Sequence, residues 1–483
     1  MCKIFLYLIF IKISSKIQNI YINSERITFM NIIVVGCGKI GYRLVAEFVN
    51  EGHDITVIDT DNPTVEEITN IYDCMGVCGN GVDCNVLESA GAREADLLVS
   101  VTNSDELNML ACFLSREMGT KNTVARIRNP EYNGDSLAFM RHKLELSMAI
   151  NPERLVAQEL YNILKIPSAF KVDYFARRNL EMIEVRLKPE SSLCGKKLSK
   201  IREKQKEEFL IAAVLRQGEL IIPDGSFELK VGDIVSIAAS PGDMQKLLKG
   251  LGLLKKQARN IMIVGGSKTA YYLADMLLAS GNDVRIVEKN LDRCRELSET
   301  LPKDAIIIHG DGSNRELLLE EGMRSLDAFL CLTELDEMNI LTSLFVSRQN
   351  VPTVISKVNK SELVDVAESM GLDYTVSAKE LTAEILLRYT RALGNSRGSA
   401  VETLYKIMDG KAEALEFVAQ DGAVYLGVSL KELSIKHGVL VVGIIREGKK
   451  ALIPNGDDKI QSGDRVIVLS ANNRLNDLSE ILR

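Results

Sequence analysis

The chain has 483 residues, of which 46% are hydrophobic and 26% are charged, values typical of a globular protein with two to four domains. Its net charge of −7 argues against a nucleic-acid binder that holds phosphates by bulk positive charge. Nine Cys without regular spacing indicate reduced thiols and not a disulfide scaffold. Cys74, Cys78 and Cys84 lie close together, but no His is spaced to complete a tetrahedral set, so we expect no metal site.

The segment before Met30 contains a short apolar run, "IFLYLIFI", from Ile4 to Ile11. A membrane-spanning helix needs about 20 apolar residues, and no small-residue cleavage site of a signal peptide follows the run. We therefore interpret residues 1–29 as a mis-started or disordered extension and Met30 as the start of the folded chain. We expect no other segment to span a membrane.

An internal repeat organises the rest of the chain. At one constant shift Gly79 aligns with Gly310, Asn108 with Asn339, and the turn "IPDG" with "IPNG". The chain is thus a single unit present twice, and each unit has two parts. We predict domains over residues 30–150, 151–250, 258–376 and 377–483, with a basic junction, "LLKGLGLLKKQARN", over 247–260.

The first part of each unit alternates short apolar runs with helical patterns. In the first copy the runs are "NIIVVG", "DITVID", "CMGVCG", "DLLVSVT", "TVARIR" and "LSMAIN". Such uniformly apolar strands are usually buried on both faces, which predicts a Rossmann-like, doubly wound α/β domain with a parallel sheet. The second part is shorter and β-rich, with runs such as "LEMIEVRL" and "DIVSIAAS", and predicts a small α+β domain.

A glycine-rich loop follows the first strand and opens a helical pattern. Gly36 suits the tight turn, Gly38 lets the backbone approach a pyrophosphate, and Gly41 lets the helix lie close to the strand. Phosphates would then meet the N–H groups of the helix N-terminus. Asp59, at the end of the second strand, can accept hydrogen bonds from both ribose hydroxyls and would repel a 2′-phosphate, which favours NAD(H) over NADP(H). The loop residues predicted to contact this cofactor also include Cys37, Lys39 and Ile40.

Further candidate residues fall at the carboxyl ends of later strands, where ligands of such sheets bind. We expect Gly79 and Asn80 to border the adenine, Thr102 and Asn103 to lie near the pyrophosphate, and Arg126 to pair with a phosphate. Helix capping is the alternative for Thr102 and Asn103, and a solvated charge is the alternative for Arg126.

The second copy retains the pattern with altered glycines. Ser267 replaces the residue at which the backbone approaches the phosphates, and Ala270 replaces the last glycine. Glu288 takes the position of Asp59 and is one methylene longer, so it can still reach the ribose. We expect weaker NAD(H) binding here or a preference for a smaller adenine nucleotide. The predicted contacts of the second site are Gly265, Gly266, Ser267, Lys268, Thr269, Glu288, Gly310, Asp311 and Thr333.

The order of the four parts, with the motifs that they carry, resembles the TrkA family of potassium uptake regulators, which are built from RCK (KTN) domains. The motifs are "GCGKIG" with "VIDTD", then "GNG", "VSVTNSDELNMLAC", "ARIRNPEY" and "INPERLVAQEL", and in the second half "GDGSNRELLLEEG" and "CLTELDEMNI". The resemblance covers residues 30–483. This sequence departs from the family pattern at Ser267 and Ala270, which stand where glycines of the second loop are often found.

The resemblance implies a cytoplasmic, peripheral regulatory subunit and no enzyme. It implies NAD(H) binding, with ATP or ADP as competitors, a tetrameric ring, and attachment to a TrkH/TrkG-like membrane subunit that carries potassium. Two alternatives stay open. An NAD-dependent dehydrogenase would need an acid/base group beside the nicotinamide, and we find no such constellation. A redox-sensing repressor would need a basic helix-turn-helix, and none is visible.

Overall fold

The computed structural model describes residues 29–132, 134–165, 171–176, 178–189, 191–251, 253, 257–372, 374–395, 401–408, 410–446, 449–471, 475 and 477–483. The interpretation of residues 1–29 as an extension therefore lies, except for Phe29, outside the described residues. The chain forms two compact units. One comprises the chain through Arg126 with residues 133–149, and the other comprises residues 127–132 with everything from Ile150 onward.

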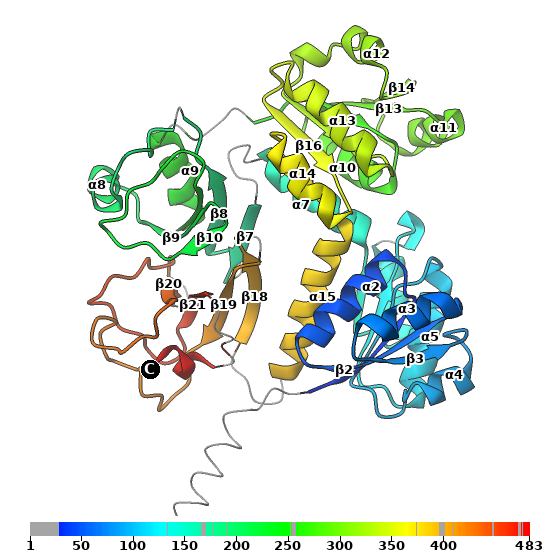
Figure 1. The fold of residues 1–483 in the computed structure, drawn as a ribbon, viewed down its shortest axis with the longest axis horizontal. Coiled ribbons are helices and arrows are strands. Elements are labelled where there is room, and N and C mark those ends of the chain that lie inside the picture. Colours follow the sequence, from blue (N-terminus) through cyan, green and yellow to red (C-terminus); the bar gives the residue numbers. More distant parts are fainter. Residues whose placement is uncertain are drawn as a thin grey trace, which may run out of the picture. The chain divides into compact units, whose positions relative to one another are not determined.

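The first unit holds a six-stranded parallel sheet of order β3-β2-β1-β4-β5-β6, drawn in blue to cyan in Figure 1. The central strands β1 and β4 are almost wholly buried, as uniformly apolar runs predict. The strands are β1 (Asn31–Val35), β2 (Asp54–Asp59), β3 (Met75–Cys78), β4 (Leu97–Ser100), β5 (Thr123–Arg126) and β6 (Met148–Ile150). The helices are α2 (Lys39–Asn50), α3 (Asn62–Ile71), α4 (Cys84–Ser89), α5 (Asp105–Met118) and α6 (Asp135–Lys143).

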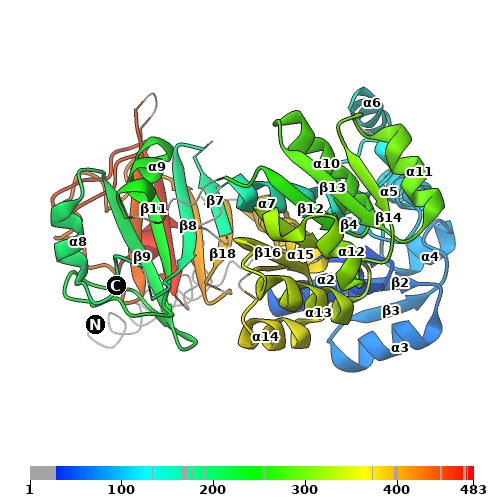
Figure 2. The same ribbon diagram turned by 90° about the horizontal axis from the view of Figure 1, so that it is seen from above.

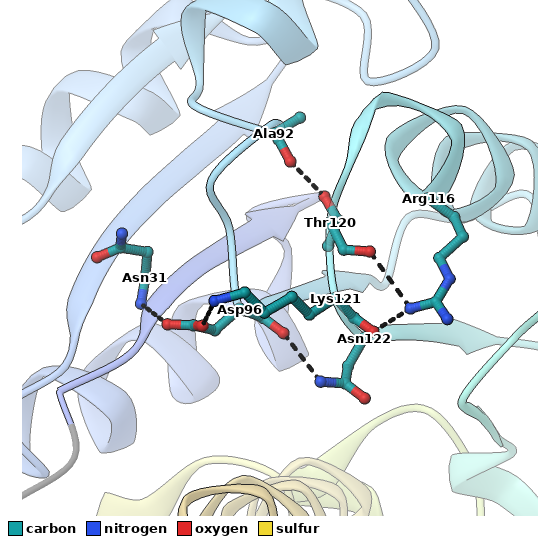
Figure 3. A network of polar contacts seen from close by, with 7 residues as sticks. All are labelled: Asn31, Ala92, Asp96, Arg116, Thr120, Lys121 and Asn122. Carbon is teal, nitrogen blue, oxygen red and sulfur yellow. Dashed lines mark hydrogen bonds and ion pairs between the residues drawn. The ribbon is translucent and has the colours of Figure 1, made fainter. Parts of the chain in front are cut away.

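A network of polar contacts around Asp96 lies at the end of this sheet where the strands begin (Figure 3). The Asp96 carboxylate accepts hydrogen bonds from Asn31 N at 3.1 Å and from Lys121 Nζ at 2.8 Å, and Asn122 Nδ2 donates to the Asp96 carbonyl at 3.2 Å. The second copy has a corresponding contact, in which the Asp327 carboxylate accepts a hydrogen bond from Asn260 N at 2.9 Å. Asp96 therefore has a structural role. The candidate ligand-binding residues lie at the opposite end of the sheet, where the strands end.

The second unit contains the second α/β domain, drawn in green to yellow in Figure 1, whose sheet has the order β14-β13-β12-β15-β16-β17. Its strands are β12 (Asn260–Val264), β13 (Asp283–Glu288), β14 (Ile306–His309), β15 (Ala328–Cys331), β16 (Thr353–Lys357) and β17 (Tyr374–Val376). Its helices are α10 (Lys268–Ala279), α11 (Leu291–Thr300), α12 (Arg315–Glu320), α13 (Asp336–Ser347) and α14 (Ser361–Ser369). Strand order and direction repeat those of the first sheet, as a duplicated unit requires.

Each half also contributes a small antiparallel sheet to the second unit. The first has the order β10-β9-β11-β8-β7 and the second β18-β19-β21-β20. The first sheet consists of β7 (Lys171–Phe175), β8 (Leu180–Arg186), β9 (Phe209–Arg216), β10 (Glu219–Ile221) and β11 (Ile234–Ala239), with helices α8 (Leu198–Lys204) and α9 (Pro241–Gly250). The second consists of β18 (Val401–Ile407), β19 (Ala412–Val418), β20 (Val439–Ile445) and β21 (Arg465–Ala471).

The two small sheets share one hydrophobic core, to which Phe175 and Ile407 both contribute. Two hydrogen bonds cross between the sheets in matching positions: Glu416 accepts from Ala176 N at 3.0 Å, and Glu184 accepts from Met408 N at 2.8 Å. Helix α9 covers the other face of the first small sheet (Figure 2). Its range shows that the predicted junction begins too early, because the buried Leu247 belongs to this helix.

Two long helices follow the α/β domains, α7 (Pro152–Lys165) and α15 (Ala378–Asn395). Helix α7 packs on α10 of the second α/β domain, where the Tyr161 hydroxyl hydrogen-bonds Ser280 Oγ at 2.6 Å and Asn151 Nδ2 donates to the Tyr272 hydroxyl at 3.1 Å. The helix that leaves the first copy thus lies against the second copy, as the figures show in teal beside green. Among the described residues, no helix is long and apolar enough to cross a membrane.

Candidate nucleotide sites

The first glycine loop has the geometry of a phosphate-binding turn. Gly36 has a φ of 94°, and a Cβ on it would lie 2.9 Å from Thr102 N, so both conformation and space require glycine. A Cβ on Gly41 would lie 1.9 Å from the Gly36 carbonyl oxygen, so position 41 also requires glycine. A Cβ on Gly38 would meet nothing within 4 Å. The space beside Gly38 is therefore open, and a ligand could approach the backbone there.

Helix α2 begins directly after Gly38 and presents unused donors. Its first backbone hydrogen bond runs from Tyr42 N to the Gly38 carbonyl at 2.9 Å, and Gly38 provides no side-chain cap. The N–H groups of Lys39, Ile40 and Gly41 precede this bond and carry the positive end of the helix dipole. The loop and the first helical turn can thus bind an anion without any basic side chain.

Asp59 ends β2 beside the loop, and its carboxylate is fixed there. One carboxylate oxygen accepts from Cys37 N at 2.6 Å and the other from Asp61 N at 3.0 Å. Each oxygen keeps capacity for a further hydrogen bond, as a ribose with two hydroxyls requires. The Cys37 N–H already donates to Asp59, and the Cys37 thiol is buried. Burial, with the negative charge of Asp59, raises the pKa of the thiol to about 12, so Cys37 is a packing residue and not a nucleophile.

The remaining candidates of the first copy lie where neighbouring strands end. Gly79 N donates to the Asp59 carbonyl at 2.8 Å, and the Asn80 side chain forms a turn by accepting from Val82 N at 3.2 Å. The alternative that Thr102 or Asn103 caps α5 is wrong, because the N-cap is Ser104, whose hydroxyl accepts from Leu107 N.

Asn108, which the sequence reasoning used only to align the repeat, ties the ends of β4 and β5 together. Its side chain is fully buried, accepts from Thr102 N at 2.8 Å, and donates to the carbonyls of Thr102 at 3.2 Å and Arg126 at 2.9 Å. Arg126 Nη1 in turn donates to the Val101 carbonyl at 3.4 Å. Asn339 repeats the arrangement with Thr333 and Lys357. The recurrence of asparagine at the same position of both copies was the signal available in the sequence.

The second loop retains an acidic residue at the end of its second strand but differs from the first loop where phosphates would bind. Gly265 has a φ of 98°, and Glu288 accepts from Gly266 N at 2.6 Å and from Asn290 N at 2.7 Å, as Asp59 does in the first copy. Ser267 is the N-cap of α10, and its hydroxyl accepts from Ala270 N at 3.3 Å. The side chain therefore turns toward the helix and takes one of the N–H groups that the first loop leaves available.

The other candidates of the second copy differ in their exposure. Lys268 is exposed and Thr269 is buried at the start of α10, and Gly310 N donates to the Glu288 carbonyl at 2.9 Å. Asp311 accepts from Ser313 Oγ at 2.7 Å and from Lys289 Nζ at 2.9 Å, contacts that lower its pKa to about 2. No group of three or more His, Cys, Asp or Glu in the described part of the chain could hold a metal ion.

Comparison with known proteins agrees with this duplicated architecture. The TrkA-N domain model matches residues 32–152 and 261–378, and the TrkA-C domain model matches residues 182–252 and 414–483. The chain is 31% identical over 449 residues to the Trk system potassium uptake protein TrkA homolog 1 of Methanosarcina mazei, covering 91% of this chain and 97% of that protein. It is also 31% identical to the Trk system potassium uptake protein TrkA of Halomonas elongata, covering 92% and 96%.

The fold is also that of solved RCK structures. The structure named GsuK channel bound to NAD matches with a TM-score of 0.61 and 17% identity, covering 92% of this chain and 78% of that one. The GsuK RCK domain matches with a TM-score of 0.60 and 17% identity, covering 92% and 93%. With two TrkA-N and two TrkA-C domains in alternating order, the chain belongs to the TrkA family of Trk system potassium uptake proteins.

Proposed function

We propose that the first α/β domain binds NAD(H) and that the protein is the regulatory subunit of a Trk-type potassium uptake system. The observation that carries the binding proposal is the pairing of Gly38, open to approach on its Cβ side, with the fixed carboxylate of Asp59. Phosphates would lie at the N-terminus of α2 and the adenosine ribose against Asp59. Gly79 and Asn80 would border the adenine, and Thr102, Asn103 and Arg126 the pyrophosphate.

The nucleotide is an effector in this proposal and is not consumed. The relatives that cover almost the whole chain are named as potassium uptake proteins. Catalysis of hydride transfer would need a proton donor or acceptor at the nicotinamide, and the sequence offers no acid/base pair for that role. ATP or ADP could compete at the first site, because they share the adenosine and phosphate groups that the loop and Asp59 would hold.

The working assembly would be a homotetramer on the cytoplasmic face of the membrane, attached to a TrkH/TrkG-like subunit that carries potassium. A closed assembly would let nucleotide-driven movements of the domains act together on a membrane partner. The functional domains would be residues 30–150, 151–250, 258–376 and 377–483. Light scattering tests the assembly: we expect a tetramer at micromolar concentration, and a monomer with and without nucleotide would contradict it.

Calorimetric titration with NADH tests the binding proposal. Hydrogen bonds to a charged acceptor contribute about 1.5–3 kcal/mol each, so Asp59→Ala should weaken NADH binding at least about tenfold. Asp59→Asn retains an acceptor for Cys37 N and separates a loss of charge from a collapse of the loop. Glu288→Ala is the matched control in the second copy and should leave the tighter of the two binding events unchanged. Unaltered affinity in a folded Asp59→Ala protein would refute the assignment.

The partnership has its own experiment. The protein should co-purify with the membrane subunit of its potassium uptake system, and NADH should change the amount that is retained. The Asp59→Ala variant should still co-purify but lose the response to NADH. Absence of any association in both conditions would contradict the regulatory role while leaving nucleotide binding intact.

A further inference from the structure

A strongly basic surface covers one side of the first small sheet. Helices α8 and α9 both pack there, and Ile201 of α8 and Leu247 of α9 belong to one hydrophobic core (Figure 1). The ends of the two helices lie together, since a Cβ on Gly250 would lie 3.0 Å from the side-chain oxygen of Gln205. The basic face consists of the exposed cations on and beside these helices: Lys197, Lys200, Arg202, Lys246 and Lys249.

The second copy repeats the backbone at α8 but not its charge. In the first copy Ser199 N donates to the Gly225 carbonyl at 3.0 Å, and in the second Lys431 N donates to the Gly456 carbonyl at 2.8 Å, so Ser199 and Lys431 correspond. Counted from this pair, the residues that take the place of the three cations at α8 are uncharged or acidic: Ser429, Glu432 and Ser434. The fold of this segment therefore does not require the positive charge.

The charge reverses at α9. Leu247 is buried against the first small sheet as Leu478 is buried against the second. This pair aligns the two cations of α9 with two acids, Asp477 and Glu480. Across the basic face, five positive charges in the first copy thus correspond to three negative charges in the second. Such a difference between two copies of one fold indicates a role that only the first copy has.

No carboxylate neutralises the basic face. None of its five cations forms an ion pair with another of the residues that the structure describes. The acid of α9, Asp243, is paired instead with Lys450 at 2.5 Å. The three acids near α8 are matched in number by three further cations, Lys196, Lys204 and Lys206. The excess positive charge therefore stays available to a negatively charged partner.

We propose that the basic face binds the surface of a membrane that contains anionic lipids. Lysine and arginine are attracted by the negative potential of such a surface, and this attraction requires neither a recess nor an inserted apolar group. A bilayer meets only the face that is turned toward it, whereas a long polyanion such as RNA would also meet the rest of a chain whose net charge is −7. The proposal goes beyond the proposed function, because the contact needs neither a nucleotide nor the potassium-carrying subunit.

Sedimentation with vesicles tests the proposal on the full chain without a membrane subunit. The protein should bind vesicles of phosphatidylcholine that contain about one third phosphatidylglycerol, and should not bind phosphatidylcholine alone. Raising the salt from about 0.1 M to about 1 M shortens the Debye length from about 10 Å to about 3 Å, so it should release the protein. The double variant Lys200→Glu with Lys249→Glu should bind at least about tenfold more weakly, since each cation near an anionic bilayer strengthens binding about fivefold.

Two controls separate this effect from misfolding and from net charge. The second copy carries glutamate at both altered positions, so the double variant should fold and should bind NADH like the parent. Lys303→Glu with Lys459→Glu makes the same charge change at exposed lysines of the second α/β domain and the second small sheet, and it should leave vesicle binding within about twofold. Failure of vesicle binding with normal NADH binding would therefore refute this proposal and leave the proposed function intact.

Several results would overturn the proposal. They are equal binding of the parent to vesicles with and without phosphatidylglycerol, binding by the double variant that equals the parent's, and an equal loss in the Lys303→Glu, Lys459→Glu control. RNA binding by the parent that the double variant loses, without vesicle binding, would assign the basic face to a nucleic acid. Loss of co-purification with the membrane subunit in detergent, again without vesicle binding, would assign it to that protein.

Discussion

Asn108 offers a sharp test of how the first site is held, because its buried amide fixes two strand ends at once. Asn108→Ala removes hydrogen bonds to Thr102 N at 2.8 Å, to the Thr102 carbonyl at 3.2 Å and to the Arg126 carbonyl at 2.9 Å. A buried backbone group left without a partner costs about 1–3 kcal/mol. Water entering the vacated space would offset part of that cost, and we expect a net loss of about 3 kcal/mol in local stability.

The loss of local stability should also weaken nucleotide binding, because Thr102 lies against the glycine loop. A Cβ on Gly36 would lie 2.9 Å from Thr102 N, so displacement of Thr102 changes the room available to the loop. We expect Asn108→Ala to weaken NADH binding about tenfold or more by calorimetry, and to lower the unfolding temperature. Asn108→Asp keeps an acceptor for Thr102 N but sets a carboxylate oxygen against two carbonyls, so it should be damaging as well.

Asn339→Ala is the matched control, since Asn339 makes the corresponding hydrogen bonds to the backbone of Thr333 and Lys357 in the second copy. It should destabilise the protein by a similar amount while leaving NADH affinity at the first loop within about twofold. The reasoning would be refuted if Asn108→Ala bound NADH normally, or if both variants weakened the binding equally.

Other parts of the structure give three further predictions. Ser267→Gly frees the Ala270 N–H that the serine hydroxyl now occupies, so it should raise NADH affinity at the second site, and an unchanged or lower affinity in calorimetry would contradict this. Burial, reinforced by the negative charge of Asp173, raises the pKa of Glu159 to about 7. The folded protein therefore keeps this proton where the unfolded chain has lost it, and stability falls as pH rises from about 4.5 to 7. Glu159→Gln should accordingly raise the melting temperature at pH 8 and change it little at pH 5, whereas equal shifts at both pH values would count against the assignment. Finally, incubation of NADH with hydroxy-acid, aldehyde or aldose substrates should leave its absorbance flat, and sustained turnover would revive the dehydrogenase alternative.

The α/β parts were predictable because their signals are local. Helix α2 (Lys39–Asn50) forms where the glycine loop opens a helical pattern, since the apolar run, the loop and the amphipathic pattern follow one another without a gap. The two parallel sheets and the alternation with small antiparallel sheets are confirmed. The identities of the nucleotide contacts remain predictions, which the titrations above address.

Other features depend on contacts between distant segments, and no pattern in the sequence marks them. The reciprocal hydrogen bonds of Glu184 and Glu416 join residues from opposite halves of the chain. The role of Ser267 was predicted in part: its position at the loop was clear, but the direction of its hydroxyl toward α10 was not. Arg293 Nε donates to the Gly266 carbonyl of the second loop at 2.6 Å, a contact that the sequence could not show, because a single cation in a helix looks like a solvated charge.

The central claim is that nucleotide held by the first loop controls potassium movement through a membrane partner. The most direct measurement is potassium flux into proteoliposomes that contain the membrane subunit of the system and this protein, with and without NADH. We predict that NADH changes the flux and that Asp59→Ala, although still bound to the membrane subunit, abolishes the change. A flux that is identical with and without NADH for the wild-type protein, or a response that persists unaltered in Asp59→Ala, would contradict the account.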